Sequence, residues 1–151
     1  GNIWEGGHRV PFIARWPGEI EAGFCNDAII SLTDIFATFA GLTCNTNISG
    51  GEDSHNMLDI MKGKDYSQTD ELPRVFHSSK GIFAIRKGQW KFIQGDKGNG
   101  NPRIMPHKDS LDFVGQLYDL SSDPYETNDL WEEKPEKVKE LLDLLNQIKS
   151  N

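Results

Sequence analysis

The C-terminal helix constrains the fold of this chain more than any other feature of its sequence. From Pro135 onward, apolar residues recur at the three- and four-residue spacing of one helix face. These residues are Val138, Leu141, Leu142, Leu145 and Ile148. Pro135 suits the first turn of a helix, where its missing N–H is not needed. A helix with one apolar stripe must bury that stripe against another element, so the rest of the chain has to supply a surface for it.

Four short segments ahead of the helix predict that surface. Each is rich in aromatic and aliphatic residues, as strands are, and they lie at residues 75–77, 81–86, 90–94 and 116–120. Lys87-Gly88 predicts a hairpin between the second and third segments, and Asp123-Pro124 predicts a turn after the fourth. We therefore expect a small antiparallel sheet with the amphipathic helix packed on one face, which is an α+β arrangement.

The first half of the chain predicts helices instead. An apolar face over residues 31–41 predicts a helix with Ser31 as N-cap, Asp34 completing a capping box, and Gly41 as its stop. The residues on this face are Ile35, Phe36, Phe39 and Ala40. A shorter helix is expected within residues 53–63.

Polar residues 64–73 separate the helical half from the strand-rich half and predict a linker. At 151 residues the chain is long enough to bury a core. We therefore expect two domains, one over residues 1–73 and the other over residues 74–151.

The N-terminal segment combines a turn with a strand. Residues 4–9 read Trp-Glu-Gly-Gly-His-Arg, and paired glycines permit a tight turn and the close approach of another group. Glu5 and Arg9 flank these glycines and could pair across the turn. Val10–Ala14 predicts a strand that ends before Pro17-Gly18. A fold does not normally begin inside such a unit, so we expect a piece of a longer protein.

Composition argues against two classes of partner. The formal net charge of −7 and the pI near 5.0 disfavour sequence-independent binding of nucleic acid, which depends on a basic surface. No apolar run approaches the roughly 18 residues of a membrane span. The two cysteines, Cys25 and Cys44, form either one disulfide or two buried free thiols, because two cysteines do not make a disulfide framework.

Residues 5–11, Glu-Gly-Gly-His-Arg-Val-Pro, resemble the EGG-x-R-x-P segment of the type I sulfatases, in the alkaline-phosphatase superfamily. Later segments resemble further family motifs in the same order, at residues 51–54, 81–93 and 117–130. In the family a catalytic lysine precedes the first segment, and it would fall one position before Gly1. The resemblance implies the C-terminal portion of an arylsulfatase-like enzyme, truncated just after that lysine.

The same resemblance implies a role for each half of the chain. Residues 1–73 would end the α/β catalytic domain, adding an edge strand and a helix to its large sheet, and residues 74–151 would form the C-terminal subdomain. The implied reaction is hydrolysis of sulfate esters, of sulfated carbohydrates or aryl sulfates, by a formylglycine nucleophile beside a calcium ion. It also implies a periplasmic or secreted location.

The chain itself lacks the residues that this chemistry requires. Neither Cys25 nor Cys44 lies in the Cys/Ser-x-Pro/Ala-x-Arg motif from which formylglycine is made, and no serine does. The histidines lie too far apart for a metal site, and they are His8, His55, His77 and His107. We therefore expect the isolated chain to be inactive, with no catalytic residue, metal ligand or cofactor of its own.

Three residues are candidates for the edge of the substrate cleft, each with a plainer alternative. Trp4 and His8 flank the diglycine, but Trp4 could pack in the core and His8 could be a polar turn residue. His77 ends a predicted strand, where ordinary burial is the alternative. Glu5 and Arg9 are expected to be a structural pair around Gly6 and Gly7. The predicted hairpin also carries basic residues that could bind a sulfated glycan or simply form a solvated face. These are Lys80, Arg86 and Lys91.

The expected partners are the missing N-terminal catalytic domain and, in the parent enzyme, a sulfated small molecule or glycan. Neither nucleic acid nor a membrane is expected. Apolar surface left by the missing domain would favour self-association of the fragment. The alternative is a stand-alone, non-catalytic module that binds glycans or another protein.

Overall fold

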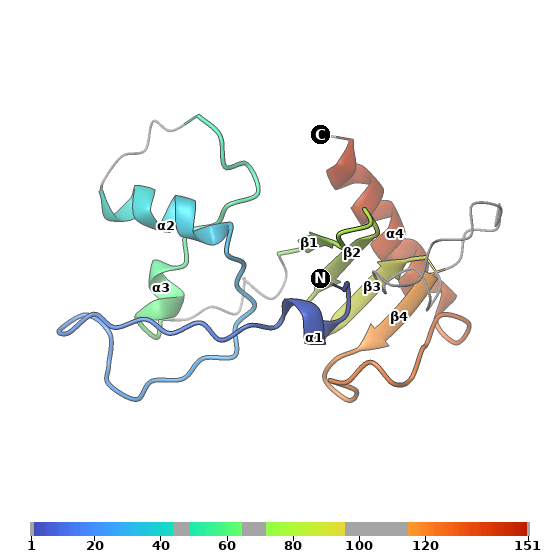
Figure 1. Cartoon of the computed structure of the whole chain (residues 1–151), viewed down its shortest axis with the longest axis horizontal. Coiled ribbons are helices and arrows are strands. Elements are labelled where there is room, and N and C mark those ends of the chain that lie inside the picture. The colour runs from blue at the N-terminus through green and yellow to red at the C-terminus, as the bar shows by residue number, and fades with distance from the viewer. Residues whose placement is uncertain (1, 44–48, 65–71, 96–114, 151) are drawn as a thin grey trace. The chain divides into compact units, whose positions relative to one another are not determined.

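The structure, a computed structural model, describes residues 2–43, 49–64, 72–95 and 115–150. The chain forms two compact units, which we describe separately (Figure 1). One unit combines Gly1–Pro11 with Pro73–Asn151, and the other is Phe12–Leu72. The predicted division placed residues 1–11 with the helices that follow them, whereas the structure groups these residues with the C-terminal sheet.

Four antiparallel strands form the sheet of the first unit, in the order β1-β2-β3-β4. Their bounds are β1 Arg74–His77, β2 Phe83–Lys87, β3 Trp90–Gln94 and β4 Gly115–Asp119. Helix α4, Pro135–Lys149, follows them. The predicted strands, hairpin and C-terminal helix are therefore confirmed, and so is the α+β class.

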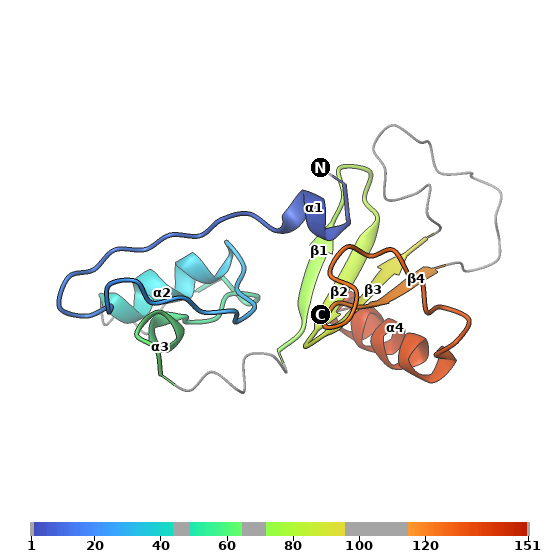
Figure 2. The same ribbon diagram turned by 90° about the horizontal axis from the view of Figure 1, so that it is seen from below.

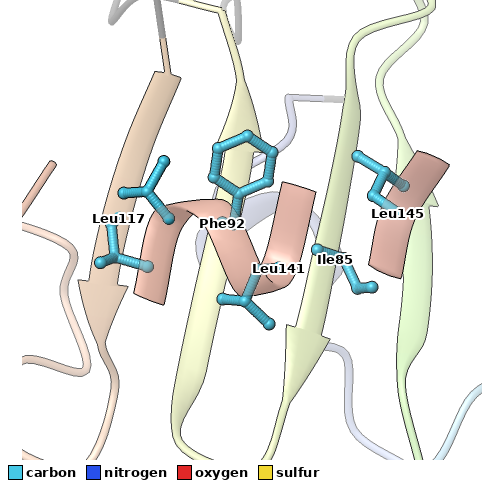
Figure 3. Packing of buried hydrophobic residues seen from close by; sticks show 6 residues of the cluster. Ile85, Phe92, Leu117, Leu141 and Leu145 are labelled. Atoms are coloured by element: carbon cyan, nitrogen blue, oxygen red, sulfur yellow. The ribbon is translucent and has the colours of Figure 1, made fainter. Parts of the chain in front are cut away.

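Helix α4 covers one face of this sheet. Strand register aligns Ile85, Phe92 and Leu117 in one row, because Ile85 pairs with Phe92 and Phe92 with Leu117. Leu141 and Leu145 of α4 pack onto this row, as Figure 3 shows, and all five side chains are buried. The period-2 pattern of the strands and the apolar stripe of the helix thus meet in a single core.

The N-terminal segment covers the opposite face of the sheet. Ile3 is fully buried there with Ala84, Ile93 and Tyr118, and a single helical turn, α1 (Glu5–His8), follows it. Figures 1 and 2 show α1 on one side of the strands and α4 on the other. Because both faces of the sheet are covered by elements of this unit, polar residues pointing away from α4 are also withdrawn from water.

The second unit contains α2 (Asp34–Leu42) and the short α3 (Leu58–Met61). Both predicted helices are present, but α2 begins at Asp34 with Thr33, not Ser31, as its N-cap, and it continues one residue past Gly41. The Asp34 carboxylate still accepts the Ser31 amide at 2.8 Å, as a capping box would. The strand predicted at Val10–Ala14 is absent from the described residues, where this stretch is an uncoiled segment (Figure 1). A strand needs a neighbour to pair with, and none of the described strands pairs with this stretch.

Helix α2 buries its polar face and leaves its apolar face open. Asp34 and Thr38 are buried, whereas Phe36 is 46% exposed and Phe39 is 61% exposed. Buried Asp34 accepts the His55 amide at 3.0 Å, and the Thr38 hydroxyl accepts the Met57 amide at 3.0 Å. Hydrogen bonds to buried polar side chains therefore connect α2 to the segment leading into α3, and the expected apolar surface is present.

Two further expectations concern the cysteines and a membrane span. Cys25 is a free and exposed thiol, so it is not buried, and Cys44 lies outside the described residues. In the described part of the chain, no helix combines the length and apolar character needed to span a bilayer.

Candidate functional site

The diglycine segment folds into the helical turn α1. The Gly7 amide donates to Trp4 O at 2.8 Å and the Arg9 amide donates to Glu5 O at 2.7 Å. A Cβ at Gly7 would lie 2.5 Å from the backbone oxygen of Asn2, so no larger residue fits without moving the backbone. A Cβ at Gly6 would meet nothing within 4 Å. Close packing therefore requires only the second of the two glycines.

Glu5 anchors this turn to the sheet through buried charges. Its Oε1 lies 2.9 Å from Lys91 Nζ, and its Oε2 lies 3.0 Å from Arg86 Nη1. Lys91 also pairs with Glu126, whose Oε1 is 2.8 Å from Nζ. The second Glu126 oxygen accepts the Glu5 amide at 2.6 Å. We call Glu5, Arg86, Lys91 and Glu126 the charge cluster.

Burial makes this cluster different from a surface ion pair. The side chain of Lys91 is 0% exposed and that of Glu126 is 3% exposed. Isolated charges are very costly to bury, and the cost is offset only where partners are present with good geometry. Here two carboxylates face two cations, so the formal charges of the cluster sum to zero.

The charge cluster differs from two expectations drawn from the sequence. Glu5 does form a structural ion pair, but its partners are Lys91 and Arg86, and Arg9 is exposed. Lys91 and Arg86 are not a solvated face of the hairpin. They lie opposite each other on β3 and β2, on the sheet face that the N-terminal segment covers.

Trp4 points the polar end of its indole into the sheet. Its Nε1 donates to Gln116 Oε1 at 3.0 Å, and the Tyr118 hydroxyl donates to the same oxygen at 2.8 Å. Burial raises the pKa of Tyr118 to about 12, and the negative charge of Asp129 adds to this shift. The phenol therefore remains protonated, and a donor, at neutral pH. The ring of Trp4 is half-buried against the cluster around Ile3.

His8 ends the turn in a partly buried position. Its ring centroid lies 5.2 Å from that of Phe76. Nε2 is buried and has no hydrogen-bond partner among the described residues. Burial lowers the pKa of His8 from its ordinary value of 6.5, and the positive charge of Lys91 lowers it further. The imidazole is therefore neutral at pH 7.

His77 lies away from the turn. It ends β1, where it is exposed, with Nδ1 3.1 Å from Ser78 O and its ring centroid 6.2 Å from that of Phe83. Side chains alternate along a strand, so His77 lies on the α4 face and its neighbour Phe76 on the face that contacts His8. Trp4 thus precedes α1 and His8 ends it, but their side chains contact opposite edge strands of the sheet, β4 and β1, and His77 is not brought to either of them.

Sequence reasoning missed the residues that hold the turn, chiefly Lys91, Glu126 and Gln116. Two signals could have found them. Lys91 interrupts an otherwise aromatic and aliphatic strand, which marks a lysine facing away from the helix-covered core. Glu126 follows the Asp123-Pro124 turn, inside a segment that carries the family resemblance.

No described side chains form a metal site. Among the described residues, no group of three or more His, Cys, Asp or Glu side chains could hold a metal ion. Calcium takes six to eight oxygen ligands, so these residues do not fit a calcium site, and we assign none of them to one.

Comparison with known proteins finds relatives among the sulfatases. No family model matches the chain. The chain is 35% identical over 150 residues, 99% of its length, to the N-acetylgalactosamine-6-O-sulfatase of Bacteroides thetaiotaomicron, and 29% identical over 163 residues to human arylsulfatase A. The chain is homologous to the sulfatases. It spans only about 30% of the length of each of these relatives.

Solved structures agree with this assignment. A Bacteroides thetaiotaomicron structure, described under the metabolism of multiple glycosaminoglycans, matches 97% of this sulfatase homologue with a TM-score of 0.81 and 36% identity. A protein in complex with its substrate D-glucosamine-2-N,6-O-disulfate matches with a TM-score of 0.64 at 20% identity, a likeness of fold alone. The family resemblance of the sequence is therefore confirmed.

Proposed function

We propose that this chain is the C-terminal portion of an enzyme that hydrolyses sulfate esters. The observation that carries the proposal is 35% identity to a sulfatase over 99% of the chain, joined to a TM-score of 0.81 with a solved relative. The chain corresponds to about 30% of that relative. The remaining part of the enzyme would precede it and would be its principal partner.

In the parent enzyme, a formylglycine would supply the nucleophile and a calcium ion would stabilise the charge of the sulfate group. Both would be held by residues outside this chain, since Cys25 lies in no maturation motif and the described residues do not fit a calcium site. The 151-residue chain by itself would therefore be inactive.

The role we assign to this chain is to shape the edge of the substrate cleft. Trp4 and His8 are the proposed cleft residues, because they stand at the beginning and the end of the turn that carries the diglycine motif. His77 would contribute separately, from the exposed end of β1.

A sulfated carbohydrate is the substrate class that we favour. The name of the 35% identical relative refers to the 6-O-sulfate of N-acetylgalactosamine, which makes this sugar sulfate the first to test. Aryl sulfates serve as chromogenic reporters of the same bond cleavage. By family analogy the enzyme would be periplasmic or secreted.

The apolar face of α2 supports a partner that covers it. Leu32, Phe36 and Phe39 are exposed and line one shallow apolar depression. A face of this kind is normally buried against another element. In the parent enzyme the preceding catalytic domain would cover it.

The test compares sulfate release by this chain and by a longer polypeptide that extends it on the N-terminal side. We expect the longer protein to hydrolyse an aryl sulfate and N-acetylgalactosamine 6-sulfate, and the 151-residue chain to hydrolyse neither. Activity in the short chain would place a nucleophile inside it. A folded longer protein without activity on either substrate would refute the proposed function.

A further inference from the structure

Three segments that carry the sulfatase resemblance meet at the charge cluster. Glu5 belongs to the diglycine segment, Lys91 to the hairpin and Glu126 to the segment after β4. Lys91 is 86 residues from Glu5 along the chain, and Glu126 is 121 residues from it. Each segment supplies one charged side chain to the same buried group, so the three sequence motifs are parts of a single arrangement in space.

The turn α1 does not hold itself in place. It is only four residues long, and its N-cap residue, Trp4, makes no capping hydrogen bond with its own side chain. Isolated helical turns of this length are unstable in water, because nucleation costs more than one or two hydrogen bonds return. Contacts with the sheet must therefore set the position of Trp4 and His8.

Glu126 makes two of these contacts through an unusual backbone. Its φ of 56° is left-handed, and it is the one non-glycine residue with positive φ in the described part of the chain. Its loop is closed by Asp123, which accepts the Thr127 hydroxyl at 2.9 Å and the Asn128 amide at 2.8 Å. A strained conformation persists only where surrounding contacts impose it, and it often marks a functional position.

The Glu126 carboxylate uses one oxygen to contact α1 and the other to contact Lys91 of β3. One oxygen accepts the Glu5 amide at 2.6 Å, the first backbone N–H of the turn. The other lies 2.8 Å from Lys91, which in turn lies 2.9 Å from the Glu5 carboxylate. Glu126 therefore contacts the turn directly, at the Glu5 amide, and indirectly through Lys91.

We propose that Glu126 is a positioning residue for the turn Trp4–His8, so that the C-terminal subdomain sets the edge of the substrate cleft. The effect of this positioning on catalysis rests on the proposed function. The competing explanation is that Glu126 merely adds to the stability of the whole unit. The two explanations differ in whether its loss loosens the turn alone or loosens turn and sheet together.

Amide hydrogen exchange on the 151-residue chain, read by mass spectrometry on peptides covering residues 3–9 and strands β3 and β4, separates them. For Glu126→Ala we expect the exchange rate of the turn to rise by roughly tenfold more than that of β3 and β4, because the turn loses a hydrogen bond to a charged acceptor. The unbalanced charge left on Lys91 lowers the stability of the whole unit and so accelerates turn and strands by the same factor. Glu126→Gln retains an acceptor for the Glu5 amide but loses the charge, so its turn should exchange at an intermediate rate. The exposed Glu132→Ala is the matched control and should change neither region.

Equal acceleration in turn and strands would overturn the proposal, and so would an unchanged turn in both Glu126 variants. If Glu126→Ala fails to fold, the Glu126→Gln variant decides in the same way. In the longer protein, Glu126→Ala should lower kcat/KM for an aryl sulfate by roughly tenfold, with Glu126→Gln restoring part of it and Glu132→Ala unaffected. A wild-type longer protein without sulfatase activity would refute the proposed function and leave the exchange result standing.

Discussion

Replacing Lys91 by methionine should destabilise the sheet unit strongly, because it removes a cation that two buried carboxylates share. In the wild-type chain the carboxylates of Glu5 and Glu126 are balanced by Lys91 and Arg86. Methionine preserves much of the length and the apolar packing of the lysine stem. The cluster is then left with one net negative charge, next to a Glu126 side chain that is only 3% exposed.

The magnitude follows from the burial of Lys91, whose side chain is 0% exposed. Removing one partner from a buried ion pair costs about 3–5 kcal/mol, since the other charge stays buried. In a domain of this size each kcal/mol lowers the melting temperature by about 4–8 °C. We therefore expect the Tm of Lys91→Met to fall by at least about 12 °C.

Thermal and urea unfolding followed by far-UV circular dichroism measure this loss. Lys139→Met is the matched control, because Lys139 is exposed on α4 and should change stability by less than about 0.5 kcal/mol. The double variant Lys91→Met/Glu126→Gln restores a charge sum of zero. It should therefore be more stable than Lys91→Met alone, by about 0.5–3 kcal/mol. A Lys91→Met variant as stable as the control, or one that Glu126→Gln destabilises further, would refute the reasoning.

Three further predictions concern the turn, the sheet and the open face of α2. Gly7→Ala should lower the free energy of unfolding by about 1–3 kcal/mol, because the new Cβ would collide with Asn2. Gly6→Ala should not lower it, because a Cβ at Gly6 would meet no atom within 4 Å. Urea titration of the two variants distinguishes them. Burial raises the pKa of Tyr118 to about 12, whereas the phenol of the unfolded chain ionises near pH 10. The free energy of unfolding, relative to that of Tyr118→Phe, should therefore fall as the pH rises from about 10 to about 12. Denaturant titrations across that range test the sign. The chain should self-associate through exposed apolar side chains, and Phe39→Ser should reduce the mass measured by light scattering; a wild-type monomer at high concentration would contradict this.

Local patterns in the sequence determined the sheet and its helix. The apolar stripe from Val138 to Ile148 and the four apolar segments ahead of it predict α4 and the strands, because periodicity records which side of an element is buried. Residues 90–94 were predicted as a strand and form β3 with the same bounds. The resemblance to the sulfatases was also visible in the sequence, in motifs spread over most of its length, and the 35% identical relative is a sulfatase.

Sequence alone was less able to place the candidate site. The diglycine segment, Trp4 and His8 were identified from the family motif. Their partners were not, since Lys91 and Glu126 lie 86 and 121 residues away from Glu5. Strand Val10–Ala14 was predicted from composition, but pairing is a non-local property and no described strand pairs with it.

What only the tertiary structure decided is whether a polar face meets water or another segment. Alternation along β3 places Lys91 opposite the apolar core, but it leaves open whether that side of the sheet is solvated. Residues 3–9 cover it, and the lysine becomes the centre of a buried cluster. Helix α2 shows the same principle. Asp34 is buried and accepts a hydrogen bond from the backbone amide of His55, whereas Phe39 stays exposed. Periodicity reports the two faces of an element, whereas burial depends on what the rest of the chain places against each face.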